Sequence, residues 1–378
     1  MTGSPPFRFA SASGSDPGTL ARELATGLAP QGTGQRNGSM FGLLYLSDSM
    51  ARHGAELLDA LRIATGVGQW AGCAGMALIG GREEFYETPA AVALVGELDP
   101  EDFRLIRGPV DSFESLREQL AGFLEPGQAG RLLLHADPGF AGLEDLLTRI
   151  DQETAWFTTG GVSSGQGEVV QFADAVLSGG VSGLALRDSV PLAARHTQGC
   201  SPLPGQHRLT ETWRNIIVKL DERPALAVFR EAIGDVLARD LRRALGYIHI
   251  GLPIPGSDTG DYRVRNIIGI DLDRDLLAVG EMLEQGQHVL FVRRDGQAAR
   301  EDLERMVDEI RSRNSDGIRG AVYVSCVGRG RHQFGNEGTE VGIVQDALGD
   351  IPLVGFFANG EIFANRLYGY TGVLTLFT

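Results

Sequence analysis

Residues 42–47 read GLLYLS, a short apolar run typical of a buried strand, and residues 50–65 (MARHGAELLDALRIAT) have the apolar spacing of a helix. A glycine-punctuated strand follows at 70–76 (WAGCAGM), and an apolar strand at 91–98 (AVALVGEL) closes the unit. This order of strand, helix, strand and closing strand predicts an α/β protein, in which helices cover the faces of mixed sheets.

The same order recurs twice further along the chain. The second copy has its strand, helix and two further strands at residues 131–135, 142–151, 156–164 and 183–187, and the third has them at 321–326, 340–348, 353–361 and 371–377. The copies share a pattern rather than residues, and their spacing is too wide for a solenoid. We therefore expect a protein of related αβ-layered parts.

A turn-rich break at Pro202–His207 separates the second copy from a different region. That region has the pattern of a strand pair, an amphipathic helix, two strands and another helix, at residues 208–220, 224–245, 247–254, 264–271 and 297–313. We place the domain boundary near Gly205. The predicted organisation is a flexible N-terminal segment over residues 1–38, one domain over 39–205 and a second, related domain over 206–378.

Charge and cysteine content exclude several classes of protein. The 378 residues hold 34 Lys+Arg and 49 Asp+Glu, so the formal net charge is 34 − 49 = −15, which argues against nucleic acid as a partner. Three widely separated cysteines exclude a disulfide-stapled scaffold and favour a reducing compartment. Since there is no N-terminal apolar signal and no apolar run of about 20 residues, we predict a cytoplasmic protein without a membrane segment.

Two polar motifs stand where an apolar strand gives way to a glycine loop: residues 325–331 (SCVGRGR) and 355–361 (GFFANGE). Backbone N–H groups in such loops, and an arginine among them, can bind a carboxylate or phosphate. If the two strands are neighbours, Arg329 and Glu361 face a common crevice at the carboxyl ends of the strands. The alternative is that Arg329 and Glu361 form a structural ion pair and no binding site.

Catalysis has weaker support. Cys326, beside two arginines, would be a nucleophile if those cations lowered the pKa of its thiol, and His332 is then the only base close in sequence. The alternative is an inert, buried cysteine. The GVSSG motif at 161–165 lacks the helix that a nucleophile elbow needs, so it predicts a turn. We predict that the chain is not an enzyme.

Metal and cofactor sites also find little support. His196 and Cys200 lack the partner residues of a zinc site, so we predict no metal. His249 or His332 would be the axial ligand if the protein bound haem, but a single histidine in a strand is more often a hydrogen-bonded core residue.

From about residue 40 to its C-terminus the chain resembles the FIST family. The motifs that carry this resemblance are GC at 72–73, GGVSS at 160–164, QGCSPLP at 198–204, SCVGRG at 325–330 and GFFANGEI at 355–362. The resemblance implies paired N- and C-terminal sensory domains, found in bacterial signalling proteins and in a eukaryotic F-box protein, that bind small ligands such as amino acids. It also implies an alternative, because some bacterial members bind haem and act as nitric-oxide sensors that regulate a histidine kinase.

We expect an intracellular small-ligand sensor that signals through a separate partner protein. Arg329 would bind the carboxylate of an amino acid or small acid, and Asn359 and Glu361 would hold an amine or hydroxyl group. Cys326, Gly328 and Gly330 would form the rest of the site. The alternatives are the haem-based sensor and a protein-interaction scaffold without a small ligand.

Overall fold

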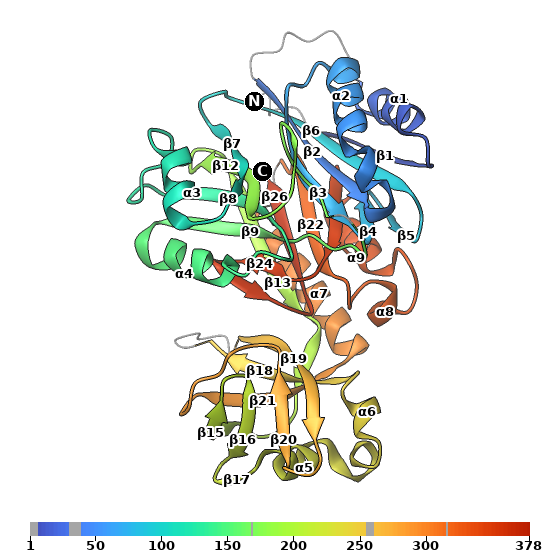
Figure 1. Cartoon of the computed structure of the whole chain (residues 1–378). Coiled ribbons are helices and arrows are strands. Elements are labelled where there is room, and N and C mark those ends of the chain that lie inside the picture. Colours follow the sequence, from blue (N-terminus) through green and yellow to red (C-terminus); the bar gives the residue numbers. More distant parts are fainter. Residues whose placement is uncertain (1–6, 30–38, 168, 255–260, 315–316) are drawn as a thin grey trace. The chain divides into compact units, whose positions relative to one another are not determined.

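The computed structural model describes residues 7–29, 39–167, 169–254, 261–314 and 317–378 (Figure 1). The chain forms two compact units, residues 1–197 with 300–378 and residues 198–299. Both contain helices and strands, and the sheets of the first are mixed, which confirms the predicted α/β class. Across the described ranges no helix is long and apolar enough to cross a membrane.

The first unit contains three six-stranded mixed sheets, and each is built on one of the three predicted copies. In every copy the first strand pairs parallel with the second and antiparallel with the closing strand. These strands are β2 (Ser39–Ser47), β3 (Gln69–Gly75) and β6 (Ala90–Leu98); β8 (Gly130–Ala136), β9 (Trp156–Val162) and β12 (Val181–Arg187); and β22 (Gly320–Cys326), β23 (Leu353–Ala358) and β26 (Thr371–Phe377). The repeat predicted from the sequence is confirmed.

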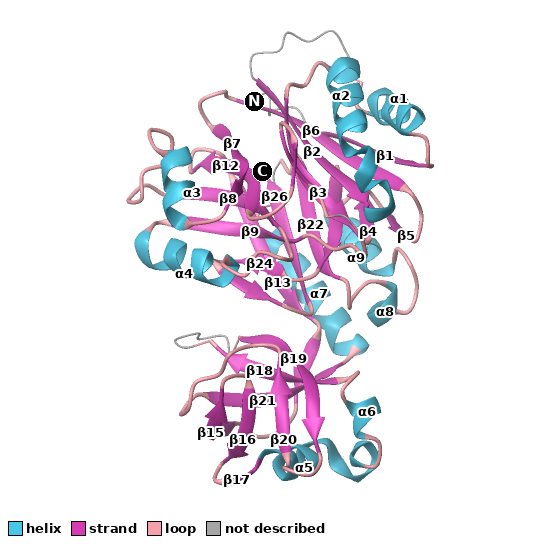
Figure 2. Ribbon diagram, viewed as in Figure 1, coloured by secondary structure: helices cyan, strands magenta, loops and turns pink. Residues whose placement is uncertain are grey.

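No copy completes its own sheet, because the hairpin after each second strand joins the sheet of another copy. Figure 2 shows one such contact, β24 beside β9. The hairpin β4 (Ala77–Gly80)–β5 (Glu83–Tyr86) follows β3 but pairs with β23. The hairpin β24 (Glu361–Phe363)–β25 (Arg366–Tyr368) follows β23 but pairs with β9. The hairpin β10 (Gln171–Ala173)–β11 (Val176–Leu177) follows β9 and pairs with β3, which closes the exchange into a ring.

The opposite edge of each sheet is formed by β1 (Arg8–Ser13), β7 (Phe103–Val110) or β13 (Leu192–Gln198). The three sheets share one apolar core, to which Phe41, Leu133 and Val324 contribute from different sheets. Their outer faces are covered by helices. These helices are α1 (Pro17–Gly27) and α2 (Gly54–Thr65) with the short η1 (Asp48–His53), α3 (Phe113–Leu120) and α4 (Leu143–Glu153), and α7 (Gly296–Arg313) and α9 (Thr339–Leu348).

A glycine occupies the same position on the second strand of each copy. Gly72, Gly160 and Gly355 lie opposite Leu44, Leu134 and Tyr323 in the parallel register. A Cβ atom at these glycines would lie 1.8, 1.9 and 1.8 Å from the carbonyl oxygen of the opposite residue. The glycines that punctuate the predicted strands are therefore required by close approach of two backbones.

The second unit is a closed ring of antiparallel strands. Its six strands in order are β15 (His207–Trp213), β16 (Ile216–Leu220), β20 (Leu276–Val279), β19 (Tyr262–Asp271), β18 (Ile248–Pro253) and β21 (His288–Arg294), and β21 also carries β14 (Cys200–Pro202) while β16 carries β17 (Arg223–Pro224). The single helix predicted over 224–245 is two helices, α5 (Ala225–Ala238) and α6 (Leu241–Ala244). Gly234, with φ 75° and ψ 165°, interrupts α5, and Val236 beyond it is 83% exposed.

The compact units cut across the predicted segments 39–205 and 206–378, because residues 300–378 complete the third sheet of the first unit. The prediction of a flexible segment over residues 1–38 is wrong for residues 7–29. There β1 pairs with β6 from Arg8↔Val95 to Ser13↔Ala90, and α1 packs its apolar side on the same sheet. Residues 1–6 and 30–38 lie outside the described residues.

Candidate functional site

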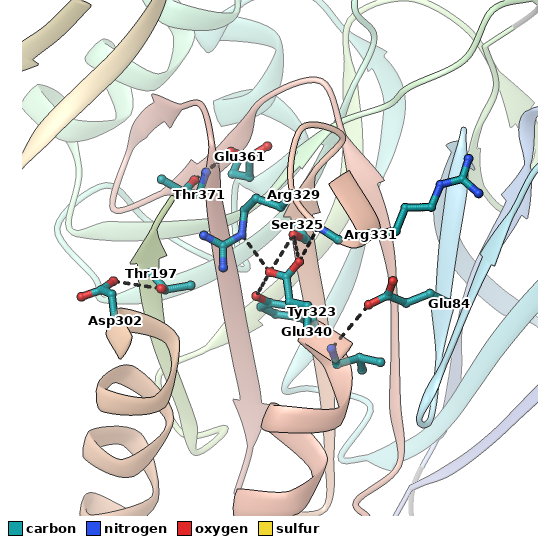
Figure 3. A network of polar contacts seen from close by, with 12 residues as sticks. Glu84, Thr197, Asp302, Tyr323, Ser325, Arg329, Arg331, Glu340, Glu361 and Thr371 are labelled. Atoms are coloured by element: carbon teal, nitrogen blue, oxygen red, sulfur yellow. Dashed lines mark hydrogen bonds and ion pairs between the residues drawn. The ribbon is translucent and has the colours of Figure 1, made fainter. Parts of the chain in front are cut away.

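Arg329 lies in the loop between β22 and the short helix α8 (Arg331–Phe334), and its side chain is completely buried. Its Nε atom donates to Glu340 Oε1 at 2.8 Å (Figure 3). Glu340 belongs to the first turn of α9, where backbone N–H groups favour a negative charge. The ion-pair partner of Arg329 is thus Glu340, and the alternative of an Arg329–Glu361 ion pair is wrong.

Glu340 is held by several further donors. Its Oε1 accepts hydrogen bonds from the Tyr323 hydroxyl at 2.6 Å and the Ser325 hydroxyl at 3.0 Å, and its Oε2 accepts from the Gly330 backbone N–H at 2.8 Å. Tyr323 and Ser325 are two apart on β22 and therefore share one face of the strand. Donors on both oxygens stabilise the ionised carboxylate. Burial opposes the charge on Arg329, but Glu340 and Tyr323 outweigh it and hold the pKa of the guanidinium above its usual range.

The two terminal nitrogens of Arg329 are the unusual feature of this cluster. Nη1 and Nη2 are buried and have no hydrogen-bond partner among the residues that the structure describes. The nearby Tyr323 hydroxyl gives its proton to Glu340, and the Phe334 ring centroid lies 5.2 Å from the guanidinium carbon. Two parallel N–H groups of one buried guanidinium are the geometry that binds a carboxylate through two hydrogen bonds.

Glu361 is a second buried carboxyl group of the same cluster. Its Oε2 accepts hydrogen bonds from the Thr371 backbone N–H at 3.0 Å and the Thr371 hydroxyl at 2.8 Å. Its Oε1 has no partner in the described part of the chain. Burial raises the pKa of Glu361 to about 8, although Thr371, Arg329 and Cys326 act in the opposite direction. The carboxyl group is therefore mostly protonated at neutral pH.

The structure brings Arg329, Cys326 and Glu361 together. Arg329 and Glu361 both lie close enough to Cys326 to act on the pKa of its thiol. Burial and then Glu361 raise that pKa, so the idea of a thiol activated by arginines is wrong. The geometric reason is that Arg329 is already neutralised by Glu340. His332, the candidate base, is exposed.

The other predicted residues have mixed outcomes. Gly328 packs so closely on Tyr370 that a Cβ atom would lie 2.9 Å from its ring, and Gly330 has a φ of 51°. Asn359 is exposed, and its amide donates to the Ser163 carbonyl at 3.5 Å, so the structure does not place it in the buried cluster. Conversely, the sequence did not single out Glu340 or Tyr323, and it marked Ser325 only as part of the 325–331 motif.

The two histidines of the haem alternative lie in different units. His249 is buried in β18, where burial and then Arg294 lower its pKa to about 4. His332 lies in α8, with its ring centroid 6.3 Å from that of Tyr86. Among the residues described, no group of three or more His, Cys, Asp or Glu side chains could hold a metal ion. Haem binding stays a prediction.

The paired-domain organisation implied by the sequence motifs is matched by known protein families. Residues 40–223 match the FIST N domain and residues 225–364 match the FIST C domain. The chain belongs to the FIST family. The two matches meet next to α5, inside the second compact unit, so each family domain contributes to both units.

Similar proteins occur in mycobacteria. An uncharacterised protein of Mycobacterium tuberculosis is 29% identical over 354 residues, covering 89% of this chain and 90% of that protein. An uncharacterised protein of Mycobacterium bovis is 30% identical over 381 residues, covering 94% of this chain and 96% of that protein. The likeness therefore extends over nearly the whole chain.

Proposed function

We propose that this protein is a sensor that binds a small carboxylate or an amino acid at Arg329 and reports it to a separate signalling protein. FIST domains are small-ligand sensory domains of signalling proteins. The observation that carries the proposal is the pair of buried Arg329 nitrogens, Nη1 and Nη2, that lack a partner in the described structure. A buried charged donor without an acceptor is costly, and a ligand carboxylate would remove that cost.

Glu340 prepares Arg329 for this task. By accepting from Nε, it fixes the plane of the guanidinium and leaves both Nη groups available. Because Arg329 and Glu361 are completely buried, a ligand can reach them only if a neighbouring segment moves. The Val327–Gly330 loop is the segment that carries Arg329, so we propose that its movement converts binding into a change at the surface. A histidine kinase is one kind of partner that this output would suit.

The test is a thermal-shift screen of amino acids and small carboxylates, followed by calorimetry with whichever compound binds. Arg329→Lys keeps the charge but removes the forked geometry, and we expect it to weaken binding at least tenfold. Arg331→Lys is the matched control and should bind normally. Arg331 is a half-buried arginine at the start of α8, two residues after Arg329, and it pairs with Glu87 and Glu337. Equal ligand affinity in Arg329→Lys and wild type would contradict the assignment of the site to Arg329. A screen in which no compound binds would favour the alternative of a protein-interaction scaffold.

A further inference from the structure

The loop that carries Arg329 is held by a hairpin from the other family domain. Arg329 lies within the FIST C match, whereas β4 and β5 lie within the FIST N match. The ring-like exchange brings the hairpin there, because β4 pairs with β23 from Gly80↔Val354 to Leu78↔Phe356. Strand β5 is thereby the outer strand of the sheet that contains the Arg329 site.

Tyr86 on β5 contacts the end of this loop, where α8 begins. Its hydroxyl accepts a hydrogen bond from the Arg331 backbone N–H at 3.2 Å, and its ring centroid lies 4.4 Å from the Arg331 guanidinium carbon. The Tyr86 ring also packs on the ring of Phe357, with centroids 5.1 Å apart. A Cβ atom at Gly330 would lie 1.8 Å from the Tyr86 hydroxyl oxygen. Tyr86 thus occupies the space beside the residue that follows Arg329.

Glu84, two residues earlier on β5, contacts the first turn of α9. Its carboxylate accepts from the Val341 backbone N–H at 3.5 Å, in the turn of α9 that carries Glu340 (Figure 3). Glu84 is 8% exposed, and its Oε2 has no partner within the described residues. Burial, and then the negative charge of Glu340, raise the pKa of Glu84 to about 7, against donors from Gly338, Tyr86 and Val341.

We propose that Tyr86 and Glu84 are positioning residues for the ligand site at Arg329, so that one hairpin of the FIST N region completes a site built in the FIST C region. Tyr86 supports the backbone beside Arg329, and Glu84 supports the backbone beside Glu340. The two ends of the Arg329–Glu340 ion pair therefore rest on a single strand. This inference rests on the proposed function for its purpose, but the geometry that it describes can be measured without any ligand.

The experiment follows the Nε–H group of Arg329 by nitrogen-15 NMR in the full chain, with its signal identified by its loss in Arg329→Lys. Tyr86→Phe keeps the ring and removes the hydroxyl that accepts from the Arg331 N–H and donates to Glu84. We expect the Nε–H to exchange with solvent about fivefold faster. Glu84→Gln removes the titrating group. In wild type, exchange should depend on pH between about 5 and 8 beyond its intrinsic pH dependence, because ionised Glu84 repels Glu340. Glu361, whose pKa of about 8 also responds to Arg329, contributes to this dependence as well. Glu84→Gln should therefore remove the part of the extra dependence centred near pH 7 and leave the part due to Glu361.

Glu83→Gln is the matched control, because Glu83 is the exposed neighbour of Glu84 on the same strand. It should behave like wild type in both measurements. Unchanged Nε–H exchange in Tyr86→Phe and an unchanged pH profile in Glu84→Gln would overturn the inference. Titration of wild type with sodium acetate, the simplest carboxylate probe, tests the proposed function separately. If neither acetate nor any compound of the screen binds, the proposed function fails. The exchange data still decide whether the β4–β5 hairpin positions Arg329.

Discussion

Arg329 and Glu340 form an ion pair that is removed from water, with exposed fractions of 0% and 1% for the two side chains. Truncating one partner of such a pair leaves a buried charge without compensation, which costs about 3–5 kcal/mol. We therefore expect Glu340→Ala to lower the free energy of unfolding by about this amount, measured by urea denaturation. The control is Glu337→Ala, three residues before Glu340, which removes an exposed partner of Arg331. It should change the free energy of unfolding little. A small effect of Glu340→Ala would show that the pair is hydrated.

Glu361 leads to a prediction about pH. Its pKa is raised from 4.5 to about 8 in the folded protein, so the folded state holds this proton more tightly than the unfolded state. The stability that it contributes is complete below about pH 4.5 and is lost as the pH rises through about 8. Glu361→Gln mimics the protonated form, so its unfolding free energy should gain on that of wild type between pH 5 and pH 9. Parallel pH profiles for the two proteins would contradict a neutral Glu361.

The sequence singled out Arg329 and Glu361 of the buried cluster but not the residues that bond to them. Glycine loops after apolar runs marked Arg329 and Glu361, because the end of a buried strand is visible in the pattern of hydrophobic residues. The Arg329–Glu340 pairing depends on the path of the intervening loop and helix α8, which no periodicity encodes. The exposure of Asn359 was not predictable for the same reason, since its side-chain amide bonds to the carbonyl of Ser163, just after β9 and far away in the sequence.

At the scale of the strands, the repeated glycines give a direct test of packing. A Cβ atom at Gly355 would lie 1.8 Å from the Tyr323 carbonyl oxygen, so Gly355→Ala must push β22 and β23 apart. We expect Gly355→Ala to have a lower melting temperature than wild type in a thermal scan. Gly342→Ala is the control: Gly342 lies inside α9 with nothing within 4 Å of its Cβ position, and alanine there should stabilise the helix by about 0.5–1 kcal/mol. Equal melting temperatures for Gly355→Ala and wild type would contradict the close approach.

The long apolar elements of the three copies were predictable, because each is long enough to show the spacing of apolar residues that is typical of a helix or a buried strand. The exchanged hairpins were not. Residues 353–361 were expected to be a single strand, whereas β23 ends at Ala358 and β24 begins a new pairing at Glu361. A strand of three or four residues has too few apolar positions to show which sheet it joins, so its partner is decided by tertiary contacts.

At the scale of the whole molecule, the compact units predict how fragments behave. Residues 198–299 have their own strand ring and apolar core, so this fragment should fold alone and give a dispersed NMR spectrum. Residues 206–378 should not fold completely, because β22 and β23 would lack β4 and β5 at one edge of their sheet and β13 at the other. A cooperative unfolding transition for all elements of the 206–378 fragment would contradict the exchanged topology.

The sequence could not show this division. The break in composition near Gly205 lies close to the point where the chain leaves the first unit, but nothing in the pattern shows that the chain returns to that unit at residue 300. The third copy has the same element order as the first two, and that similarity was the available sign that all three belong together. The path of the chain back into the first unit through α7 became clear only from the packing of that helix on the third sheet.

The exchange of hairpins has a consequence for synthesis on the ribosome. Strand β9 receives its edge partner β24 only after residues 361–363 have been made, near the end of translation. Until then a nascent chain that has already formed β8 and β9 exposes the backbone N–H and C=O groups of β9 along one side. Such an open edge pairs readily with other chains, so we expect newly made protein to depend on chaperones that shield it, and premature termination before residue 361 to yield aggregates.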